Sequence, residues 1–322
     1  MQFGKISGID KPVSRIAHGT IKANSKDLEG SFALLDAVYA AGITTFDTAQ
    51  SYGSGDNERT VGRWILERGV RDQVVILSKG AHHSQDRQRV TPYDITADIH
   101  DSLARFQTDH LDLYILHRDN PALPVGPIVE VLNEHHAAGK IGPFGGSNWT
   151  WERVCEANEY AAAHNLVPFA ASSPNFSLAE MVKEPWANCI SISGPQGEAA
   201  REWYAEHNMA LFTWSSLAGG FFSGRFKRDN LNTFDEYFDG VVVNSYCYET
   251  NFQRLDRASQ LAAAKDVTVA QIAVTWVLSQ PLNVFALLAP QTPEEVRLNV
   301  QALELKLTQA ELDWLDLRRP DR

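Results

Sequence analysis

The hydrophobic positions of this chain fall into eight short runs separated by stretches with helical spacing. Several runs, such as VVILSK at 74–79, are almost continuously apolar, which is typical of parallel strands that are buried on both faces. The runs cover residues 14–19, 43–48, 74–79, 111–117, 141–147, 166–172, 209–215 and 283–289.

Between these runs, apolar residues recur every three or four positions, which predicts amphipathic helices. The helix over 32–42 has Gly42 just past its end, and the helix over 91–106 has Thr91 as N-cap and Pro92 at its first position. Further helices are predicted at 57–68, 126–139, 151–164, 197–207, 251–264, 269–279 and 293–303.

Eight alternations of strand and helix, with no linker-like break in composition, predict a closed (β/α)8 TIM barrel. We expect a single domain over 1–322 that begins with an N-terminal β-hairpin. Two stretches do not fit the alternation. Residues 222–250 are expected to form a long, irregular, lid-like loop, and 307–319 an extra C-terminal helix.

The overall charge indicates a small-molecule partner. The chain has 29 Lys and Arg against 40 Asp and Glu, a net charge of −11, which disfavours binding to nucleic acid or to an anionic membrane surface. The cysteines Cys155, Cys189 and Cys247 are widely spaced and odd in number, which favours a reducing compartment. No apolar leader or membrane-spanning run is evident, so we expect a cytoplasmic protein; the sequence indicates no oligomeric state.

Polar residues at the ends of the predicted strands form a proton-transfer set. Asp47 and Tyr52 follow the second strand, Lys79 the third and His117 the fourth, at the end of a barrel where chemistry takes place. A nearby ammonium lowers the pKa of a tyrosine, and a carboxylate keeps a buried ammonium charged. We therefore expect Lys79 and Asp47 to lower the pKa of Tyr52, and His117 to orient an oxygen that Tyr52 protonates, as in carbonyl reduction.

Each of these residues also has a plainer interpretation. Asp47 could cap the following segment, Lys79 could be an ordinary residue at a strand end, and a single His at a strand end is more often structural. A metal-dependent hydrolase needs clustered ligands, and the first strand supplies only one His. The adjacent pairs His82–His83 and His135–His136 are expected to diverge, so no metal site is predicted.

Six motifs are spread over the chain: GITTFDTAQSYG (42–53), ILSK (76–79), LDLYILH (111–117), GGSN (145–148), WSSLAGG (214–220) and TPEEVRLNV (292–300). With these motifs in this order, essentially the whole chain resembles the aldo-keto reductase family. The resemblance implies a barrel that binds NADPH, or less often NADH, and reduces aldehydes or ketones by hydride transfer.

The same resemblance assigns roles by position. Tyr52 is implied as the general acid, Lys79 and Asp47 as the pair that tunes it, and His117 as the residue that orients the carbonyl. Ser147 and Asn148 are implied to bind the nicotinamide carboxamide, Phe176 to stack on the ring, and Ser215, Leu217 and Gly219 to lie along the pyrophosphate. The remaining cofactor contacts implied are Gly19, Thr20, Ser173, Gln291, Glu295 and Asn299.

Two departures from the family pattern concern the cofactor. Ser173 stands where the family usually has Gln, so a shorter side chain or a water would hold the carboxamide. Ala289, Gln291 and Glu295 stand where Lys or Arg often binds the 2′-phosphate, and Glu295 would repel it. The basic residues that could compensate are Arg225, Lys227 and Arg297. We therefore expect NADPH to be the cofactor, with NADH only slightly less favoured.

A third departure concerns the substrate. His117 is followed by the polar residues Arg118, Asp119 and Asn120, and we expect Arg118 and Trp149 to contact substrate. With Trp151 and three tyrosines of the long loop, this predicts a mouth suited to a hydroxylated compound such as a sugar or keto-sugar; those tyrosines are Tyr237, Tyr246 and Tyr248. The alternative is a solvated turn closed by Pro121.

A function without turnover is the main alternative to a reductase. Potassium-channel β subunits that resemble aldo-keto reductases keep the cofactor pocket and often a pair like His117–Arg118. A nucleotide-binding regulatory subunit would therefore carry the same motifs, with Tyr52 dispensable.

Overall fold

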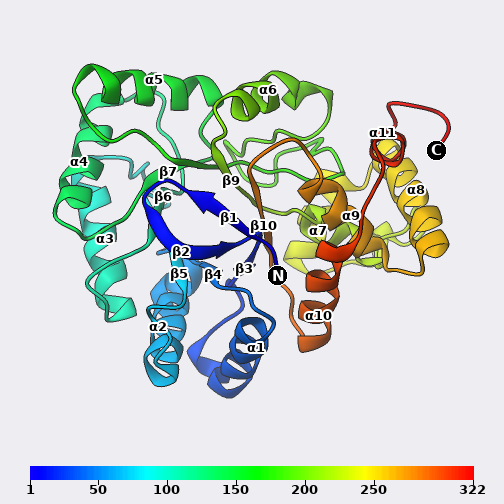
Figure 1. Cartoon of the computed structure of the whole chain (residues 1–322), viewed down its shortest axis with the longest axis horizontal. Coiled ribbons are helices and arrows are strands. Elements are labelled where there is room, and N and C mark those ends of the chain that lie inside the picture. Colours follow the sequence, from blue (N-terminus) through cyan, green and yellow to red (C-terminus); the bar gives the residue numbers. More distant parts are fainter.

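The computed structural model describes residues 1–322, and at its centre eight parallel strands form a closed barrel (Figure 1). Each strand pairs with the next in chain order, and β10 closes the ring against β3. The predicted (β/α)8 architecture is confirmed. The strands are β3 (Ile16–Gly19), β4 (Thr45–Asp47), β5 (Val75–Gly80), β6 (Leu113–Leu116), β7 (Phe144–Ser147), β8 (Ala171–Ser173), β9 (Ala210–Thr213) and β10 (Val284–Leu288).

Helices surround the barrel, and their positions follow the predicted periodicity. The Thr91 side chain accepts a hydrogen bond from the Asp94 amide, and Gly42 lies just past the first helix with φ 84°, as expected. The helices are α1 (Leu28–Ala40), α2 (Asp56–Arg68), α3 (Pro92–Phe106), α4 (Gly126–Ala137), α5 (Trp151–Ala163), α6 (Glu198–Glu206), α7 (Tyr237–Tyr246), α8 (Glu249–Lys265), α9 (Val269–Leu278), α10 (Pro293–Gln301) and α11 (Gln309–Leu315).

An N-terminal hairpin closes the end of the barrel where the strands begin. β1 (Phe3–Ile6) pairs antiparallel with β2 (Ile9–Ser14), and the hairpin lies across the barrel (Figure 1). Ile6 and Val13 pack onto the barrel interior, and Lys11 Nζ donates to the carbonyl of Val74, just before β5. The hairpin does not cover the opposite end, where the strands finish and where a functional site is expected.

Side chains of the strands alternate between two cores. One cluster of 63 buried residues lies between strands and helices, and a second of 12 fills the barrel interior. The interior cluster consists of Ile6, Val13, Ala17, Val75, Leu77, Leu113, Ile115, Ala171, Ala210, Phe212, Phe285 and Leu287. This alternation fixes which strand-end side chains face into the barrel mouth.

Two predictions need correction. The segment 222–250 is not an irregular loop throughout, because it contains the ten-residue helix α7. The sixth strand begins at Ala171 rather than 166, because the amides of Val167 and Phe169 bond to the side chains of Asn133 and Asn158 instead of a neighbouring strand. The extra C-terminal helix is present as α11.

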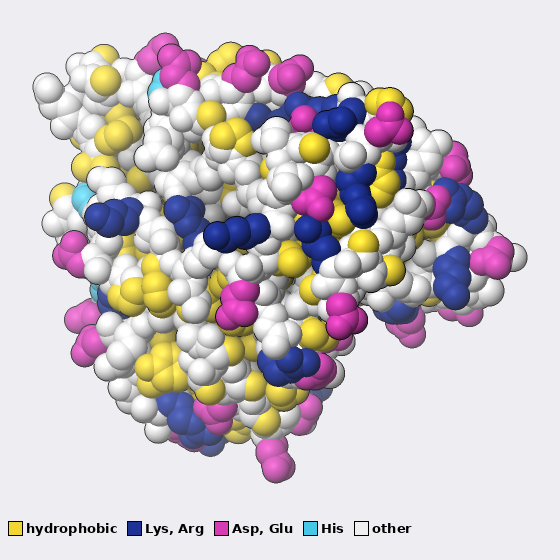
Figure 2. All heavy atoms as spheres, turned by 45° about the vertical axis from the view of Figure 1, so that its right-hand side comes forward, with side chains coloured by type: hydrophobic (Ala, Val, Ile, Leu, Met, Phe, Trp, Pro, Cys, Tyr) yellow, Lys and Arg dark blue, Asp and Glu magenta, His cyan; other side chains and the backbone are white.

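On the surface, basic and acidic side chains are interspersed over the face shown in Figure 2. No single helix is long and apolar enough to cross a membrane; α8 and α9 meet the length and composition requirement only jointly, with a bend of 103° between them.

Candidate active site

The strand alternation brings the predicted catalytic residues to one end of the barrel. Lys79 lies two residues beyond the interior residue Leu77, and His117 two beyond Ile115. Asp47 follows Phe46, which faces the helices, so Asp47 faces inward. All three side chains therefore point into the barrel at the ends of β4, β5 and β6.

Lys79 and Asp47 form a buried ion pair. The Lys79 ammonium bonds to Asp47 Oδ1 and to the carbonyl of Thr48 at 2.9 Å, and only 3% and 5% of the two side chains are exposed. Burial alone would lower the pKa of Lys79, but the charges of Asp47 and Tyr52 raise it. Lys79 is therefore held as an ammonium inside the barrel.

A second buried carboxylate supports β5 from the helix side. Glu58, in α2, accepts hydrogen bonds from Ser78 Oγ at 2.8 Å, Ser102 Oγ at 2.7 Å and Arg105 Nη1 at 3.0 Å. Ser78 precedes Lys79 and faces the opposite way. This network fixes the strand that carries Lys79, and no local pattern in the sequence predicts it, because its members come from three separate segments.

Tyr52 lies in a short 3-10 turn directly after β4. Its ring centroid is 5.2 Å from Lys79 Nζ, and the turn passes through Gly53 and Gly55, whose φ angles of 55° and 88° favour glycine. Burial raises the pKa of Tyr52, and Lys79 lowers it by a smaller amount. The expectation of a lowered pKa is wrong, because desolvation outweighs the ammonium; Tyr52 keeps its proton at neutral pH and can donate it.

His117 faces Tyr52 across the mouth. The ring centroids are 5.9 Å apart and nearly perpendicular, at 79°. Burial first, and then the charge of Lys79, hold the pKa of His117 well below its ordinary value, so the ring is neutral. Its Nδ1 is buried and has no hydrogen-bond partner in the protein.

His82 also lies at this end of the barrel, although the sequence predicts only that its side chain diverges from that of His83. Its ring lies 4.8 Å from that of His117 and 4.3 Å from that of His83, so the two adjacent histidines do not diverge. The reason is that both follow β5 in an irregular loop, where Ala81 has φ 59° and strand alternation no longer applies.

Three of the predicted nicotinamide contacts line the adjoining part of the mouth. Ser147 Oγ donates to the carbonyl of Ser173 at 2.9 Å, and Asn148 Nδ2 donates to Ser147 Oγ at 3.2 Å. Ser173 Oγ is buried with no protein partner. The short Ser173 side chain thus retains an unused donor and acceptor beside Ser147 and Asn148.

Trp214, rather than Phe176, carries an aromatic ring into this mouth. Phe176 is fully buried and its ring packs on Trp276 of α9, 5.5 Å away, so the prediction that it stacks on a cofactor is wrong. Trp214 lies two residues beyond Phe212, packs on the barrel interior and is only half-buried. Its Nε1 has no protein partner. The alternation along β9 was the signal in the sequence for this residue.

The predicted pyrophosphate segment follows Trp214 and lies under α7. Ser215 has φ 51° and Gly219 φ 65°, so the chain turns sharply here. A Cβ at Gly219 would lie 2.9 Å from Val242 of α7, which shows how closely that helix covers the segment. Leu217, between them, is half-buried.

At the predicted adenosine end, side chains of α10 and the residues just before it occupy the start of the helix. Glu295 Oε2 accepts a hydrogen bond from the Gln291 amide at 2.6 Å, and Thr292 Oγ1 caps the Glu295 amide at 3.2 Å. Asn299 is buried one turn further along. Two of the three basic candidates are engaged: Arg297 pairs with Glu294, and Arg225 pairs with Asp239. Lys227, the third, is exposed.

Gly19 and Thr20 lie at the end of β3. Thr20 Oγ1 is 2.9 Å from both the Asp47 carbonyl and Asn57 Oδ1, and Thr20 is 1% exposed. Its hydroxyl therefore ties β3 to β4 and α2, next to Asp47, while Gly19 is half-buried.

Of the two predicted substrate residues, the structure brings only Arg118 to the site. Trp149 is fully buried, its Nε1 donates to the Arg118 carbonyl at 3.2 Å, and its ring lies 5.1 Å from that of Phe169. The prediction that Trp149 lines the mouth is therefore wrong, because Gly146 makes room for the indole behind β7: a Cβ there would be 2.6 Å from the ring. Tyr246 is also buried, with its Oη bonded to Asn175.

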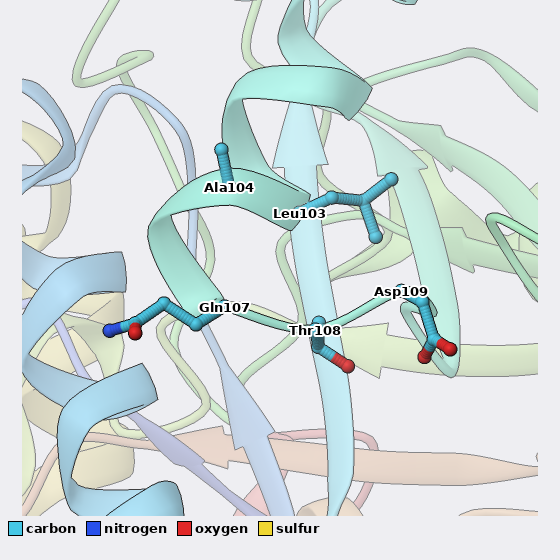
Figure 3. Close-up of a pocket in the computed structure, with 5 residues that line it drawn as sticks. All are labelled: Leu103, Ala104, Gln107, Thr108 and Asp109. Atoms are coloured by element: carbon cyan, nitrogen blue, oxygen red, sulfur yellow. The ribbon is translucent and has the colours of Figure 1, made fainter.

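One hollow in the surface lies away from this site. A depression of about 580 Å³ lies at the C-terminal end of α3, lined by Leu103, Ala104, Gln107, Thr108 and Asp109 (Figure 3). Because α3 returns the chain to the start of β6, this hollow is at the hairpin end of the barrel. The titratable cluster, not this hollow, marks the candidate active site.

Comparison with known proteins agrees with this geometry. The family model of the aldo/keto reductase family matches residues 15–317. An aldo-keto reductase, YhdN, from Bacillus subtilis is 28% identical over 310 residues, covering 92% of this chain and 87% of its own. A probable voltage-gated potassium channel β subunit from Oryza sativa subsp. japonica is 25% identical, covering 95% of this chain and 92% of its own.

A solved structure gives the same result. The crystal structure of an aldo-keto reductase from Klebsiella pneumoniae, in complex with NADPH, matches 100% of this chain and 97% of its own with a TM-score of 0.73 and 26% identity. With the barrel, the Asp47–Lys79 pair and the facing Tyr52 and His117 in place, the chain belongs to the aldo/keto reductase family.

Proposed function

We propose that this protein is an NAD(P)H-dependent carbonyl reductase in which Tyr52 is the general acid. The observation that carries the proposal is the convergence of four groups at the barrel mouth: the Asp47–Lys79 pair, Tyr52 above Lys79, and a neutral His117 facing Tyr52. A protonated phenol beside a fixed ammonium suits an oxygen that becomes an alkoxide.

The residues would divide the work as follows. A reduced nicotinamide, when bound, supplies the hydride that adds to the carbonyl carbon. Neutral His117 would orient the carbonyl oxygen toward Tyr52 Oη, which gives up its proton to that oxygen. Lys79 would stabilise the tyrosinate that remains, and Asp47 keeps Lys79 charged.

The nicotinamide end of the cofactor fits the residues of this mouth. Ser173 Oγ and Trp214 Nε1 are polar atoms without protein partners. Ser173 lies beside Ser147 and Asn148, and the Trp214 amide bonds to the carbonyl of Pro174, the residue after Ser173. Ser147, Asn148 and Ser173 would hold the carboxamide, and the half-buried Trp214 ring would cover one face of the nicotinamide.

NADPH is the cofactor we propose, slightly ahead of NADH. NADPH is bound by the similar Klebsiella pneumoniae enzyme. Against it, the Glu295 carboxylate bonds to the Gln291 amide, and Arg297 pairs with Glu294, so the start of α10 offers little positive charge to a 2′-phosphate.

For the substrate we propose a hydroxylated carbonyl compound such as a sugar or keto-sugar. The polar groups at the mouth are His117, His82 and Arg118, and the aromatic surface comes from Tyr52 and Trp214. Asp119, in the polar run that follows His117, pairs with Arg153. We also propose a cytoplasmic location, because all three cysteines are free thiols.

The test is a screen of the purified protein with NADPH and with NADH against aldehydes, aldoses and keto-sugars, following absorbance of the reduced cofactor. Carbonyl-dependent oxidation of the cofactor is expected. Tight cofactor binding with no oxidation by any carbonyl would instead support a regulatory subunit, the role suggested by the similar potassium-channel β subunit.

A further inference from the structure

The buried guanidinium of Arg118 lacks a carboxylate partner. Arg118 is 7% exposed, and its only side-chain hydrogen bond is from Nη1 to Cys189 Sγ, at 3.2 Å. Its Nε is buried without any partner in the protein. A buried charge is costly unless it is paired.

Other buried cations in this chain show what the normal arrangement is. Lys79 pairs with Asp47; Arg153 pairs with Asp119 and Glu156; Arg254 pairs with Glu180 and Asp316. Each is 9% exposed or less, as Arg118 is. Arg118 alone among these four has no acidic side chain within ion-pair distance.

The nearest acidic residue in the chain is held away from Arg118. Asp119 Oδ2 accepts from Arg153 Nε at 3.2 Å, and its Oδ1 accepts from the Asn120 amide at 2.8 Å. The Arg118 backbone is itself fixed, because its carbonyl accepts from Trp149 Nε1. The fold therefore positions the Arg118 side chain without neutralising it.

The charge of Arg118 acts on the reacting groups. Arg118 follows His117 at the end of β6. Burial is the largest cause of the lowered pKa of His117 and of His82, and the charge of Arg118 lowers both further. The same charge opposes the rise in the pKa of Tyr52. The ring of His82 contacts that of His117 at 4.8 Å. Because Arg118 directly follows His117, a ligand held by its guanidinium would lie close to the groups at this end of the barrel.

We propose that the carbonyl substrate carries a carboxylate group, which pairs with the buried guanidinium of Arg118. This inference rests on the proposed reductase function and narrows its substrate class to oxo acids, including acidic sugars. A planar carboxylate matches the fork of a guanidinium, whose Nε and Nη atoms donate side by side. Arg118 Nε is the unused donor of that fork.

The kinetic test compares an acid with its neutral ester. We expect 4-carboxybenzaldehyde to have a kcat/KM at least tenfold above that of methyl 4-formylbenzoate. A second pair, D-glyceraldehyde 3-phosphate and D-glyceraldehyde, measures in the same way the preference for a phosphate group. Equal values for acid and ester would overturn the proposal. A larger preference for the phosphate than for the carboxylate would overturn the choice of carboxylate.

Arg118→Met should abolish that preference, bringing the ratio of acid to ester within about twofold of one, and Arg118→Lys should keep part of it. The matched control is Arg63→Met, which removes the same charge from an exposed pair with Glu67 on α2 and should leave the ratio unchanged. If Arg118→Met weakens NADPH binding more than tenfold, the guanidinium serves the cofactor and the proposal is wrong.

A measurement without turnover separates this inference from the proposed function. Without ligand, Arg118→Met should unfold at the same temperature as the wild type or about 2 °C higher, since it removes an unpaired buried charge. Arg153→Met should unfold at a lower temperature than the wild type, because the substitution leaves the buried Asp119 carboxylate without its ion-pair partner. Sodium benzoate should raise the midpoint of the wild type but not of Arg118→Met, whereas benzyl alcohol should raise neither. The inference would be overturned if the unfolding midpoint of Arg118→Met fell as far as that of Arg153→Met. It would also be overturned if benzoate raised the midpoints of the wild type and of Arg118→Met equally, even if no carbonyl is reduced.

Discussion

The ring of Tyr52 meets the ring of His117 edge to face at 5.9 Å, and burial moves the pKa of the two groups in opposite directions. Burial disfavours the charged form of each, so Tyr52 stays a protonated phenol and His117 a neutral imidazole. One group can therefore donate a proton while the other forms hydrogen bonds without adding charge. The positive charge near Tyr52 comes from Lys79, whose Nζ lies 5.2 Å from the centre of the Tyr52 ring.

Tyr52→Phe tests this division of roles. We expect kcat/KM for carbonyl reduction to fall by about a thousandfold, since a positioned general acid contributes roughly 10²–10⁴. The dissociation constant for NADPH, measured by calorimetry, should change less than about threefold because the Tyr52 hydroxyl is not assigned to cofactor binding. Turnover equal to that of the wild type would rule out Tyr52 as the acid.

Trp214→Ala tests the assignment of the aromatic ring at the mouth. We expect NADPH to bind about 10-fold to 100-fold more weakly, because stacking of a base on an aromatic side chain contributes roughly 1–3 kcal/mol. Phe176→Leu is the control: it removes a ring packed on Trp276 and should lower thermal stability while leaving the NADPH affinity unchanged. Loss of affinity in the control but not in Trp214→Ala would restore Phe176 as the stacking ring.

The sequence predicted the parts of the site that regular strands determine. Asp47, Lys79 and His117 each stand at the end of a short apolar run, and a parallel barrel brings such ends together. The same alternation of strand side chains distinguishes Trp214, two residues past Phe212, from Phe176, which lies beyond the end of β8. Motif position alone indicates Phe176, whereas the strand period, which predicts the direction of a side chain, indicates Trp214.

Other features could not be predicted because they depend on irregular segments and long-range contacts. The approach of His82 to His117 follows from the backbone after Gly80, where Ala81 has a positive φ. The pairing of Asp119 with Arg153 joins the loop after β6 to α5, and the contact of Arg118 with Cys189 joins residues 71 positions apart. No local pattern specifies which of several nearby charges will pair.

His18 should make the stability of the protein depend on pH. It is 3% exposed, its Nδ1 has no partner, and burial lowers its pKa to about 4. In the unfolded chain its pKa is near 6.5, so between pH 6.5 and 4 the unfolded state binds more protons and the free energy of unfolding falls as the pH is lowered. At pH 5 the loss from this residue is about 2 kcal/mol.

The measurement is the free energy of unfolding in urea at pH 7 and pH 5 for the wild type and for His18→Gln. Glutamine does not titrate, so we expect the difference between the two pH values to be smaller in the variant by about 2 kcal/mol. His100→Gln, which changes an exposed histidine on α3, is the control and should leave the difference unaltered. An identical pH dependence in wild type and His18→Gln would show that His18 is not neutral in the folded protein.

Glu295→Gln should shift the cofactor preference toward NADPH. The carboxylate lies over the start of α10 and accepts from the Gln291 amide, so it occupies the end of the helix where an anion would otherwise be favoured. Glutamine keeps the acceptor oxygen and removes the charge. We expect the dissociation constant for NADPH, measured by calorimetry at low ionic strength, to fall about tenfold and that for NADH to change less than about twofold. Added salt should reduce the difference between the two proteins because it screens an exposed charge. An equal increase in affinity for both cofactors would mean that the substitution acts on the adenosine or on the loop. An unchanged NADPH affinity would place the 2′-phosphate away from Glu295.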